Sequence, residues 1–365
     1  MHPDTPQSWT AVGAMSGTSM DGLDLACCRF TRAEGRWRFE CLAAETLPFP
    51  DYWARLLPRL YHAGAMEYAE AHAGFGRWLG ESMAGFIRRY GLRPDVAAAH
   101  GQTIFHQPAR GFTAQLGDGE AAAAFLPCPL VMNFRSKDVA LGGQGAPLVP
   151  LGDRELFTEY QLFLNLGGIS NLSVQGRGFD LTPCNLALNH WYRQALPDAP
   201  QAYDRNGALA ASGQPVPALL AALDALDFYA APPPKSLGWE WVEQVFNPCA
   251  ARFAAEVPPA DLLHSLCLHI AGQIAAGFRQ AQAPPGALLV TGGGRHHRFL
   301  LQCLADALAP MQIRIAAAPD LWVDYKEAII FAFLGLRALL RQPTTLAAVT
   351  GAPYDVVGGS VHWPG

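Results

Sequence analysis

Residues 11–22 read Ala11-Val12-Gly13-Ala14-Met15-Ser16-Gly17-Thr18-Ser19-Met20-Asp21-Gly22, an apolar run that ends in a turn rich in glycine and hydroxyl residues. The alternating run over residues 23–30 follows, so this part of the chain predicts strand, turn and strand. The arrangement returns in the middle of the chain, where residues 163–171 read Phe163-Leu164-Asn165-Leu166-Gly167-Gly168-Ile169-Ser170-Asn171. Because each copy opens one half of the chain, we expect two related α/β lobes, the first over residues 1–150 and the second over residues 151–365.

Segments with helical periodicity alternate with the strand-like runs, as in an α/β protein. The clearest covers residues 68–90, where apolar side chains recur every three or four positions and Arg88, Arg89 and Gly91 form a typical helix end. Further helices are expected over residues 186–194, 216–226, 262–278, 299–308 and 327–340.

The composition excludes several classes of protein. The 365 residues include 26 basic and 31 acidic side chains, and the net charge of -5 gives no reason to expect nucleic acid or an anionic membrane as a partner. Hydrophobic residues make up 50% of the chain and charged ones 16%, which excludes a disordered protein. The eight cysteines are scattered without a Cys-x-x-Cys pair, so neither a zinc cluster nor a disulfide framework is expected.

Two segments bear on the location of the protein in the cell. Residues 1–15 lack the apolar core of a signal peptide. The apolar run over residues 328–336 is far shorter than the roughly 20 residues of a membrane span. We therefore expect the protein to remain in the cytoplasm, with its thiols reduced.

Three glycine-rich turns are candidates for phosphate binding. Backbone N–H groups converge in such turns, and serine or threonine hydroxyls add further donors. The turns are Ser16 to Gly22, Gly167 to Asn171, and Gly292 to Gly294, of which the last lies between an apolar strand and an amphipathic helix. Each is also compatible with an ordinary turn, and none has the spacing of a dinucleotide-binding fingerprint or of a P-loop.

Four charged or titratable side chains are candidates for the chemistry. Asp180 follows a strand-like run and either faces a cleft or caps the helix that begins near Asn185. Glu327 lies at the head of an almost entirely apolar helix, where it either interacts with the helix dipole or takes part in function. His100 ends an apolar run and is either functional or a buried, satisfied histidine. Arg135 lies in a mixed-charge turn and is either functional or simply solvated.

Taken in order, several segments of the chain resemble one family, the anhydro-N-acetylmuramic acid kinases. The matching segments are residues 13–22, His100-Gly101-Gln102-Thr103, residues 115–118, Phe134-Arg135, residues 142–150, residues 165–172, Pro232-Pro233-Pro234-Lys235-Ser236, Gly292-Gly293-Gly294, Glu327-Ala328 and residues 349–352. They extend over nearly the whole chain, so chance agreement is remote although each segment alone is unremarkable.

This resemblance implies a two-lobed fold of the actin-like, ribonuclease H-like sugar kinase superfamily, with ATP in a cleft between the lobes. It also implies which residues bind the nucleotide. By similarity, the phosphates would be cradled by Ser16, Gly17, Thr18, Ser19, Asp21, Gly22, Gly167 and Gly168, and the nucleoside would pack against Gly292, Gly293 and Gly294. Asp21 would help to hold Mg²⁺, the metal expected with ATP. Exposed apolar helices of such kinases often pair, so a homodimer is expected.

The resemblance further implies the reaction and the residues that perform it. The family hydrolyses the 1,6-anhydro ring of a recycled cell-wall sugar while phosphorylating O6, so the implied product is N-acetylmuramic acid 6-phosphate. Asp180 matches the base that takes a proton from the water attacking C1, and the released O6 then attacks the γ-phosphorus of ATP. Glu327, expected as a second catalytic residue, matches a position that lines the sugar. By similarity, His100, Arg135 and Asn185 are the expected sugar-binding residues. Arg135 suits the lactyl carboxylate in particular, because a guanidinium and a carboxylate pair through two hydrogen bonds.

The chain departs from the family in the turn after Asp180. Where the family commonly reads Asp-Thr-Gly-Pro-Gly-Asn, this chain reads Asp180-Leu181-Thr182-Pro183-Cys184-Asn185. Both glycines are replaced, so the backbone of the turn must avoid conformations that favour glycine. Asn133 also replaces a common aspartate, and Leu237 and Trp239 alter the segment after Ser236. Two alternatives therefore stay open: a kinase for a related amino sugar, and a nucleotide-binding regulator that has kept the lobes and lost the chemistry.

Overall fold

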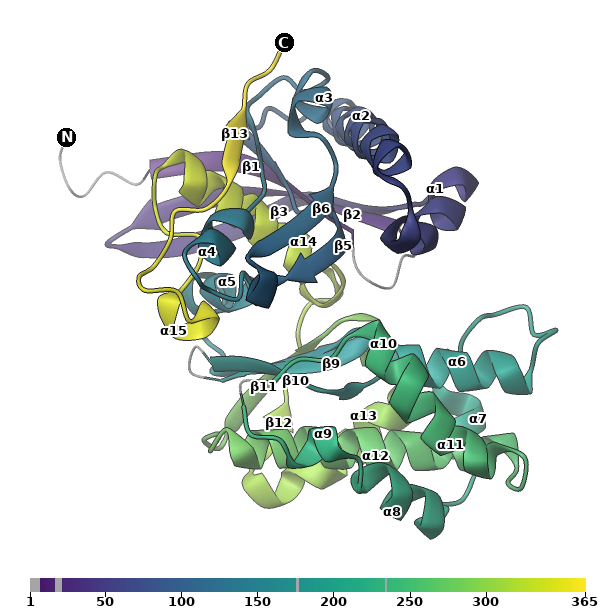
Figure 1. Cartoon of the computed structure of the whole chain (residues 1–365). Helices are drawn as coiled ribbons and strands as arrows, with labels where there is room; N and C mark the ends of the chain where they lie inside the picture. Colours follow the sequence, from purple (N-terminus) through teal and green to yellow (C-terminus); the bar gives the residue numbers. More distant parts are fainter. Residues whose placement is uncertain (1–6, 17–21, 175–176, 234) are drawn as a thin grey trace. The chain divides into compact units, whose positions relative to one another are not determined.

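The structure, a computed structural model, describes residues 7–16, 22–174, 177–233 and 235–365 (Figure 1). The chain divides into two compact units. Unit 1 combines Met1–Thr158 with Tyr325–Gly365, and unit 2 is Glu159–Asp324.

This division differs from the lobes expected on either side of residue 150. The chain passes into unit 2 only after Thr158, and residues 325–365 return to unit 1. The physical reason lies in helix α14 (Asp320–Leu339), whose C-terminal half is buried. The ring of Phe333 on this helix lies 5.4 Å from the ring of Phe30 in the unit 1 sheet, measured between centroids. The last segment of the chain therefore completes the core of the first unit.

Unit 1 is built on a six-stranded sheet in the order β13-β7-β4-β1-β2-β3. Strands β1, β2 and β3 form an antiparallel meander, β4 and β7 continue the sheet parallel to β1, and β13 pairs antiparallel with β7. A separate hairpin joins β5 to β6. The strands are β1 (Gln7–Ser16), β2 (Gly22–Ala33), β3 (Arg36–Pro48), β4 (Val96–Ala99), β5 (Gln102–Gln107), β6 (Phe112–Leu116), β7 (Leu130–Met132) and β13 (Ser360–His362).

Helices cover both faces of the unit 1 sheet. Val12 and Leu25 point to one face and pack with Leu79 of α2 in a single apolar cluster. Gly13 points to the opposite face, where an added Cβ would lie 1.9 Å from the carbonyl oxygen of Ala328 in α14. Glycine at this position thus lets the backbone of α14 lie directly on β1. The remaining helices of unit 1 are α1 (Asp51–Leu56), α2 (Ala65–Arg89), α3 (Gly119–Ala123), α4 (Ser136–Ala140), α5 (Val149–Leu156) and α15 (Ala347–Thr350).

Unit 2 repeats the strand order of unit 1 in a five-stranded sheet, β10-β9-β8-β11-β12. Its first three strands form an antiparallel meander, and β11 and β12 follow parallel to β8. When the strands of each sheet are counted along the chain, both sheets have the order 3-2-1-4-5, and unit 1 adds β13 as a sixth strand. This is the strand order of a ribonuclease H-like lobe. The strands are β8 (Leu162–Leu166), β9 (Ile169–Val174), β10 (Arg177–Pro183), β11 (Gly286–Thr291) and β12 (Ile313–Ile315).

The core of unit 2 lies between this sheet and α12. Buried leucines of β8 and β9 join Ile270, Ile274 and Phe278 of α12 in one apolar cluster. The helices are α6 (Asn185–Ala195), α7 (Ala208–Ala211), α8 (Pro217–Asp224), α9 (Asp227–Ala230), α10 (Trp239–Trp241), α11 (Asn247–Ala254), α12 (Pro259–Gln280) and α13 (Arg298–Leu308).

The cysteines and the apolar helices bear on two expectations from the sequence. All eight cysteines are free, as expected for a chain without a disulfide framework. Among the described residues, no helix combines the length and the apolar character that crossing a membrane requires.

Candidate active site

Asp180 lies where strand β10 is interrupted. Asp180 pairs with Asn171 of β9 and Thr182 pairs with Ser170, so Leu181 is an extra residue that forms a β-bulge. The side chain of Leu181 is buried in the apolar cluster of unit 2. Because a bulge changes the direction of the neighbouring side chains, the sequence at this point sets how Asp180 is presented.

The segment after the proline run holds Asp180 in place. The amide N–H of Asp180 donates to the carbonyl oxygen of Lys235 over 3.0 Å, and the amide N–H of Leu237 donates to Oδ2 of Asp180 over 2.9 Å. Burial raises the pKa of Asp180 to about 6, although the hydrogen bond from Leu237 opposes the rise. Such a carboxylate is ionised at neutral pH and more basic than an ordinary aspartate, so it can accept a proton.

The alternative role of Asp180 as a helix cap does not apply. Helix α6 begins at Asn185 with Cys184 as its N-cap residue, and no side chain caps it. Asn185 instead donates through Nδ2 to the carbonyl oxygen of Leu166 over 2.9 Å. Asn185 is therefore tied to the end of β8.

Two glycine-rich turns of unit 2 meet beside Asn185. The carbonyl oxygen of Gly168 accepts hydrogen bonds from the amide groups of Cys184 and Leu186, at 2.8 and 3.1 Å, and that of Gly167 accepts from Asn185 at 3.1 Å. Gly292 has a φ of 83°, a region that favours glycine, and an added Cβ would lie 2.3 Å from Oδ1 of Asn165. A Cβ at Gly294 would lie 3.3 Å from Oδ1 of Asn185. Three of the expected ligand-binding elements are thus adjacent: residues 167–168, Asn185 and residues 292–294.

Arg135 and His100 form a hydrogen-bonded pair in unit 1. Nε of Arg135 donates to Nε2 of His100 over 3.0 Å, and Nη1 donates to the carbonyl oxygen of Gly145 over 2.7 Å. Within the described part of the chain, Nη2 of Arg135 makes no hydrogen bond. The guanidinium is therefore oriented by two partners and keeps donors for a ligand, which differs from a simply solvated arginine.

The two partners of His100 decide its protonation. Nδ1 lies 2.7 Å from the carbonyl oxygen of Gly101, which can only accept, so Nδ1 carries the proton. Nε2 must then be bare, because it accepts from Arg135. Burial and the charge of Arg135 lower the pKa of His100 to about 3. His100 is thus a buried histidine whose two ring nitrogens both have partners, and one of these partners is Arg135.

Glu327 lies in the interior of α14 rather than at its head. The helix begins at Asp320, so the expected interaction of Glu327 with the helix dipole does not apply. Burial raises the pKa of Glu327, while the charges of Lys326 and Arg135 oppose the rise. Lys326 pairs with buried Asp153 at 3.1 Å. Within unit 1, Glu327 thus shares an electrostatic environment with Arg135.

The first glycine-rich turn is described only at its two ends. Ser16 is buried, and its hydroxyl donates to the carbonyl oxygen of Gly101 over 3.1 Å, next to His100. Gly22 pairs with Pro48 at the start of β2. The other expected phosphate and metal ligands of this turn lie outside the described residues: Gly17, Thr18, Ser19 and Asp21. Among the described residues, no group of three or more His, Cys, Asp or Glu side chains is arranged to hold a metal ion.

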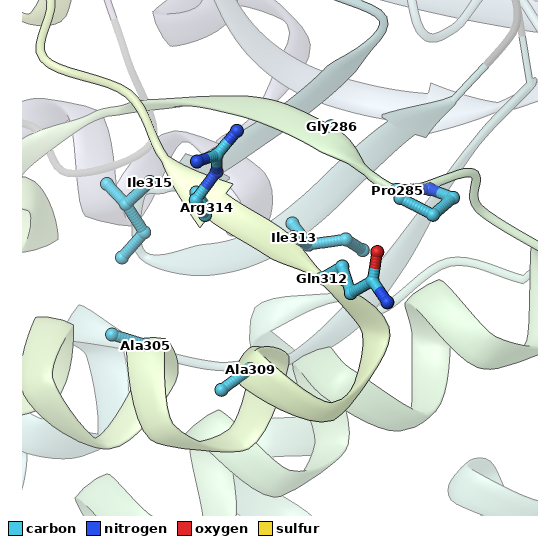
Figure 2. A pocket seen from close by; sticks show the side chains of 8 residues that line it. All are labelled: Pro285, Gly286, Ala305, Ala309, Gln312, Ile313, Arg314 and Ile315. Atoms are coloured by element: carbon cyan, nitrogen blue, oxygen red, sulfur yellow. The ribbon is translucent and has the colours of Figure 1, made fainter.

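A pocket of about 750 Å³ opens elsewhere in unit 2, at the outer strand of its sheet (Figure 2). Figure 2 shows Ala305 of α13 and Ala309, the residue that follows this helix, facing the chain segment 312–315. None of the expected site residues lines this pocket.

The chain matches the profile of a protein family described as anhydro-N-acetylmuramic acid kinase over residues 10–364. The chain belongs to this family. The anhydro-N-acetylmuramic acid kinase of Pseudomonas fluorescens (strain Pf0-1) is 36% identical over 370 residues, which cover 96% of this chain and 98% of that protein. The anhydro-N-acetylmuramic acid kinase of Cupriavidus pinatubonensis (strain JMP 134 / LMG 1197) is 38% identical over 376 residues, with 96% and 97% covered. Among solved structures, component A of (R)-2-hydroxyglutaryl-CoA dehydratase from Acidaminococcus fermentans matches with a TM-score of 0.47 and 11% identity, covering 90% of this chain and 98% of that one.

The residues that replace glycine after Asp180 do not adopt the positive φ values that favour glycine. Leu181, Thr182 and Cys184 all have a negative φ, so the turn after Asp180 does not use conformations that favour glycine. Asn133 has a φ of 59°, a conformation that asparagine tolerates better than most residues. The turn after Asp180 therefore forms without glycine at these positions, and asparagine suits the positive φ at residue 133.

Two residues that hold Asp180 in this kinase family member are not evident from local sequence. Lys235 and Leu237 contact Asp180 although they lie more than 50 positions away along the chain, at a separation of 57 for Leu237. The resemblance included Lys235 in the proline-rich segment, and this was the available signal. The resemblance does not indicate that this segment contacts Asp180, because the fold and not the local sequence brings the segment to β10.

Proposed function

We propose that this protein opens the 1,6-anhydro ring of anhydro-N-acetylmuramic acid with water and transfers the γ-phosphoryl group of ATP to O6. Membership of the anhydro-N-acetylmuramic acid kinase family over nearly the whole chain carries the proposal. The presence of a partly buried carboxylate with a raised pKa at Asp180 supports it, because the reaction needs a group that activates water.

The reaction balances as sugar plus water plus ATP giving N-acetylmuramic acid 6-phosphate plus ADP plus one proton. Asp180 takes a proton from water, whose oxygen forms a bond with C1. The bond between C1 and O6 breaks, and O6 forms a bond with the γ-phosphorus as the bond to ADP breaks. The proton held by Asp180 then leaves to solvent, which restores the carboxylate.

The polar groups of unit 1 suit the sugar. Arg135 remains charged, although burial lowers its pKa to about 10, and it is held by His100 and Gly145. A guanidinium with free donors pairs well with the lactyl carboxylate of this substrate. We assign Glu327 a second catalytic role at the sugar and Asn185 a role in binding it.

The kinase family uses ATP, and we propose that the nucleotide binds at the glycine-rich turns. In unit 2 these are residues 167–168 and 292–294, which lie together beside Asn185. Mg²⁺ would enter with ATP and neutralise phosphate charge, with Asp21 as the carboxylate that holds the hydrated ion. Loss of turnover in EDTA and its return with added Mg²⁺ would support this metal.

Replacement of Asp180 by asparagine tests the role of the base. Asparagine keeps the size of the side chain and an oxygen for Leu237, but it cannot accept the proton. We expect kcat to fall by about 10² to 10⁴ while the Kd for ATP changes little. ADP release with 1,6-anhydro-N-acetylmuramic acid would be measured, and the sugar product would be weighed by mass spectrometry.

The matched control is Asp198→Asn, an exposed aspartate of the same unit, which should keep wild-type turnover. A product heavier by both water and a phosphoryl group supports the coupled reaction. Full turnover in Asp180→Asn would remove Asp180 from the mechanism. No ADP release from the wild-type protein with this sugar would remove the proposed reaction itself.

We further propose that the protein acts in the cytoplasm as a homodimer. ATP is a cytoplasmic substrate, and such kinases often pair through exposed apolar helices. Light scattering of the purified protein at several concentrations would test the dimer.

A further inference from the structure

One short helix, α9, contacts both chain segments that flank Asp180. The first segment is the end of β10, where Thr182 follows the bulge. The hydroxyl of Tyr229 on α9 lies 2.9 Å from Oγ1 of Thr182, which is fully buried. Ser170 donates to the carbonyl oxygen of the same residue over 3.0 Å. Thr182, two residues after Asp180, is therefore fixed through both its side chain and its backbone.

The second segment is residues 235–237, whose backbone forms hydrogen bonds with Asp180. Lys235 donates through Nζ to the carbonyl oxygen of Phe228 over 3.3 Å. The same ammonium lies 4.7 Å from the centre of the Phe228 ring, a cation–π contact. Phe228 and Tyr229 are neighbours on α9, so adjacent residues hold the two sides of Asp180.

Helix α9 lies beside α12 (Figure 1). A buried histidine of α12 anchors it. Nε2 of His269 lies 3.0 Å from the hydroxyl of Tyr229, and Nδ1 lies 2.8 Å from Oδ1 of Asp224. The side chain of His269 is 0% exposed, whereas that of Asp224 is 55% exposed. Gln273 donates to the same oxygen of Asp224 over 2.8 Å. A chain of hydrogen bonds thus runs from a surface carboxylate to the strand that carries Asp180.

These bonds have one consistent direction. The Asp224 carboxylate only accepts, so Nδ1 of His269 carries the proton. Burial lowers the pKa of His269, which keeps the ring neutral and leaves Nε2 to accept from Tyr229. The oxygen of Tyr229 then accepts from the hydroxyl of Thr182. Each donor in the chain has one acceptor, and such a network holds its members rigidly.

We infer that Tyr229 and His269 are positioning residues, which act through α9 to hold the carboxylate of Asp180 from both sides. The inference rests on the proposed role of Asp180 as the base. The family pattern has a glycine where this chain has Thr182, so the hydroxyl that Tyr229 holds is a feature of this chain. Neither Tyr229 nor His269 needs to touch the substrate to act in this way.

Substitutions at both ends of the bond between Thr182 and Tyr229 test the inference. Tyr229→Phe and Thr182→Val each remove one hydroxyl and keep the shape of the side chain. We expect each to lower kcat about 10- to 100-fold while KM for ATP stays within about twofold, because a misplaced catalytic group slows chemistry more than binding. Thr182→Ser keeps a hydroxyl and should retain most of kcat.

A variant that carries both substitutions distinguishes a positioning effect from a general loss of structure. If the two hydroxyls act as one bond, Tyr229→Phe combined with Thr182→Val should be no slower than the slower single variant. Tyr192→Phe, a buried tyrosine of α6 in the same unit, is the matched control and should keep wild-type kcat. Circular dichroism of each variant confirms that it is folded. If Tyr229→Phe fails to fold, the comparison of Thr182→Val with Thr182→Ser decides.

Two outcomes overturn the inference. One is wild-type kcat in Tyr229→Phe or in Thr182→Val, and the other is a double variant in which the two losses multiply. Asp180→Asn, measured beside them, tells which proposal has failed. An inactive Asp180→Asn with fully active Tyr229→Phe removes the inference alone, whereas a fully active Asp180→Asn removes the proposed base.

Discussion

Asp180 illustrates how one side chain can be costly for folding and useful for catalysis. Burial raises its pKa from 3.8 to about 6, and the hydrogen bond from the amide of Leu237 opposes this rise. A raised carboxyl pKa means that the folded state holds the proton more tightly than the unfolded state does. The free energy of unfolding therefore falls as pH rises from about 3.8 to about 6, and the full cost applies above that range.

Asp180→Asn should consequently stabilise the protein while it lowers kcat. At pH 7.5 we expect the free energy of unfolding to rise by about 2 to 3 kcal/mol, because the buried charge is removed. The gain should shrink at pH 5, where the folded wild-type carboxyl is mostly protonated. Urea unfolding at both pH values measures the effect, with Asp198→Asn as the exposed control. Equal stability of Asp180→Asn and wild type at pH 7.5 would contradict the assigned burial of the charge.

At this scale, the sequence indicates candidate residues but not the partners that the structure gives them. Asp180, Arg135 and His100 were all singled out, because each lies where a strand-like run meets a polar turn. The pairing of Arg135 with His100 spans 35 positions and the bond from Leu237 to Asp180 spans 57, so neither can follow from local pattern. The bulge at Leu181 was also not predicted, since it depends on how β10 pairs with β9.

Among the elements, the loop between α4 and α5 depends on one buried carboxylate. Oδ1 of Asp138 accepts from the hydroxyls of Thr345 and Thr350 at 3.0 and 2.8 Å, and Oδ2 accepts from the amide of Gly145 at 2.7 Å. Asp138 is 0% exposed. Gly145 in turn accepts from Arg135, so Asp138 links the C-terminal segment to the guanidinium.

Asp138→Ala should weaken both the fold and the sugar site. We expect a loss of about 2 to 4 kcal/mol in the free energy of unfolding, because three donors lose a charged partner and the amide of Gly145 is left buried. KM for the sugar should rise more than KM for ATP, since Arg135 loses a fixed partner. Chemical unfolding and steady-state kinetics measure the two effects. The control is Asp355→Ala, an exposed aspartate that accepts from the amide of Ala347 and should cost less than about 1 kcal/mol. Similar losses in both variants would argue against a special role for Asp138.

Helix boundaries were harder to predict than helices. The pattern placed the start of the last long helix at Glu327, where the apolar run begins, but α14 starts at Asp320. Its first turn follows Pro319, whose carbonyl oxygen accepts from the amides of Trp322 and Val323. An acidic residue such as Asp320 favours a helix start through the helix dipole. The consecutive apolar residues 321–323, followed by charged Asp324 and Lys326, give no clear helical period, so this start was not evident from the pattern.

At the scale of the whole molecule, the two units do not correspond to the two halves of the chain. The repeated strand, turn and strand correctly indicated two α/β units. It could not indicate that residues 325–365 return to unit 1, because a sequence repeat marks where each unit begins and not where its last helix packs. The apolar cluster of unit 2 is made entirely from residues of that unit, whereas unit 1 needs α14 against its sheet.

This difference predicts unequal behaviour of the two parts when they are produced separately. The fragment of residues 159–324 should fold alone, with a cooperative thermal transition, because it contains its whole core. The fragment of residues 1–158 should not, since removing α14 uncovers the ring of Phe30 and the backbone of β1 at Gly13. Circular dichroism and size-exclusion chromatography of the two fragments and the full chain measure this, and addition of a fragment of residues 325–365 to the first should recover structure. A stable, monomeric fragment of residues 1–158 would mean that α14 is not required for the first unit to fold.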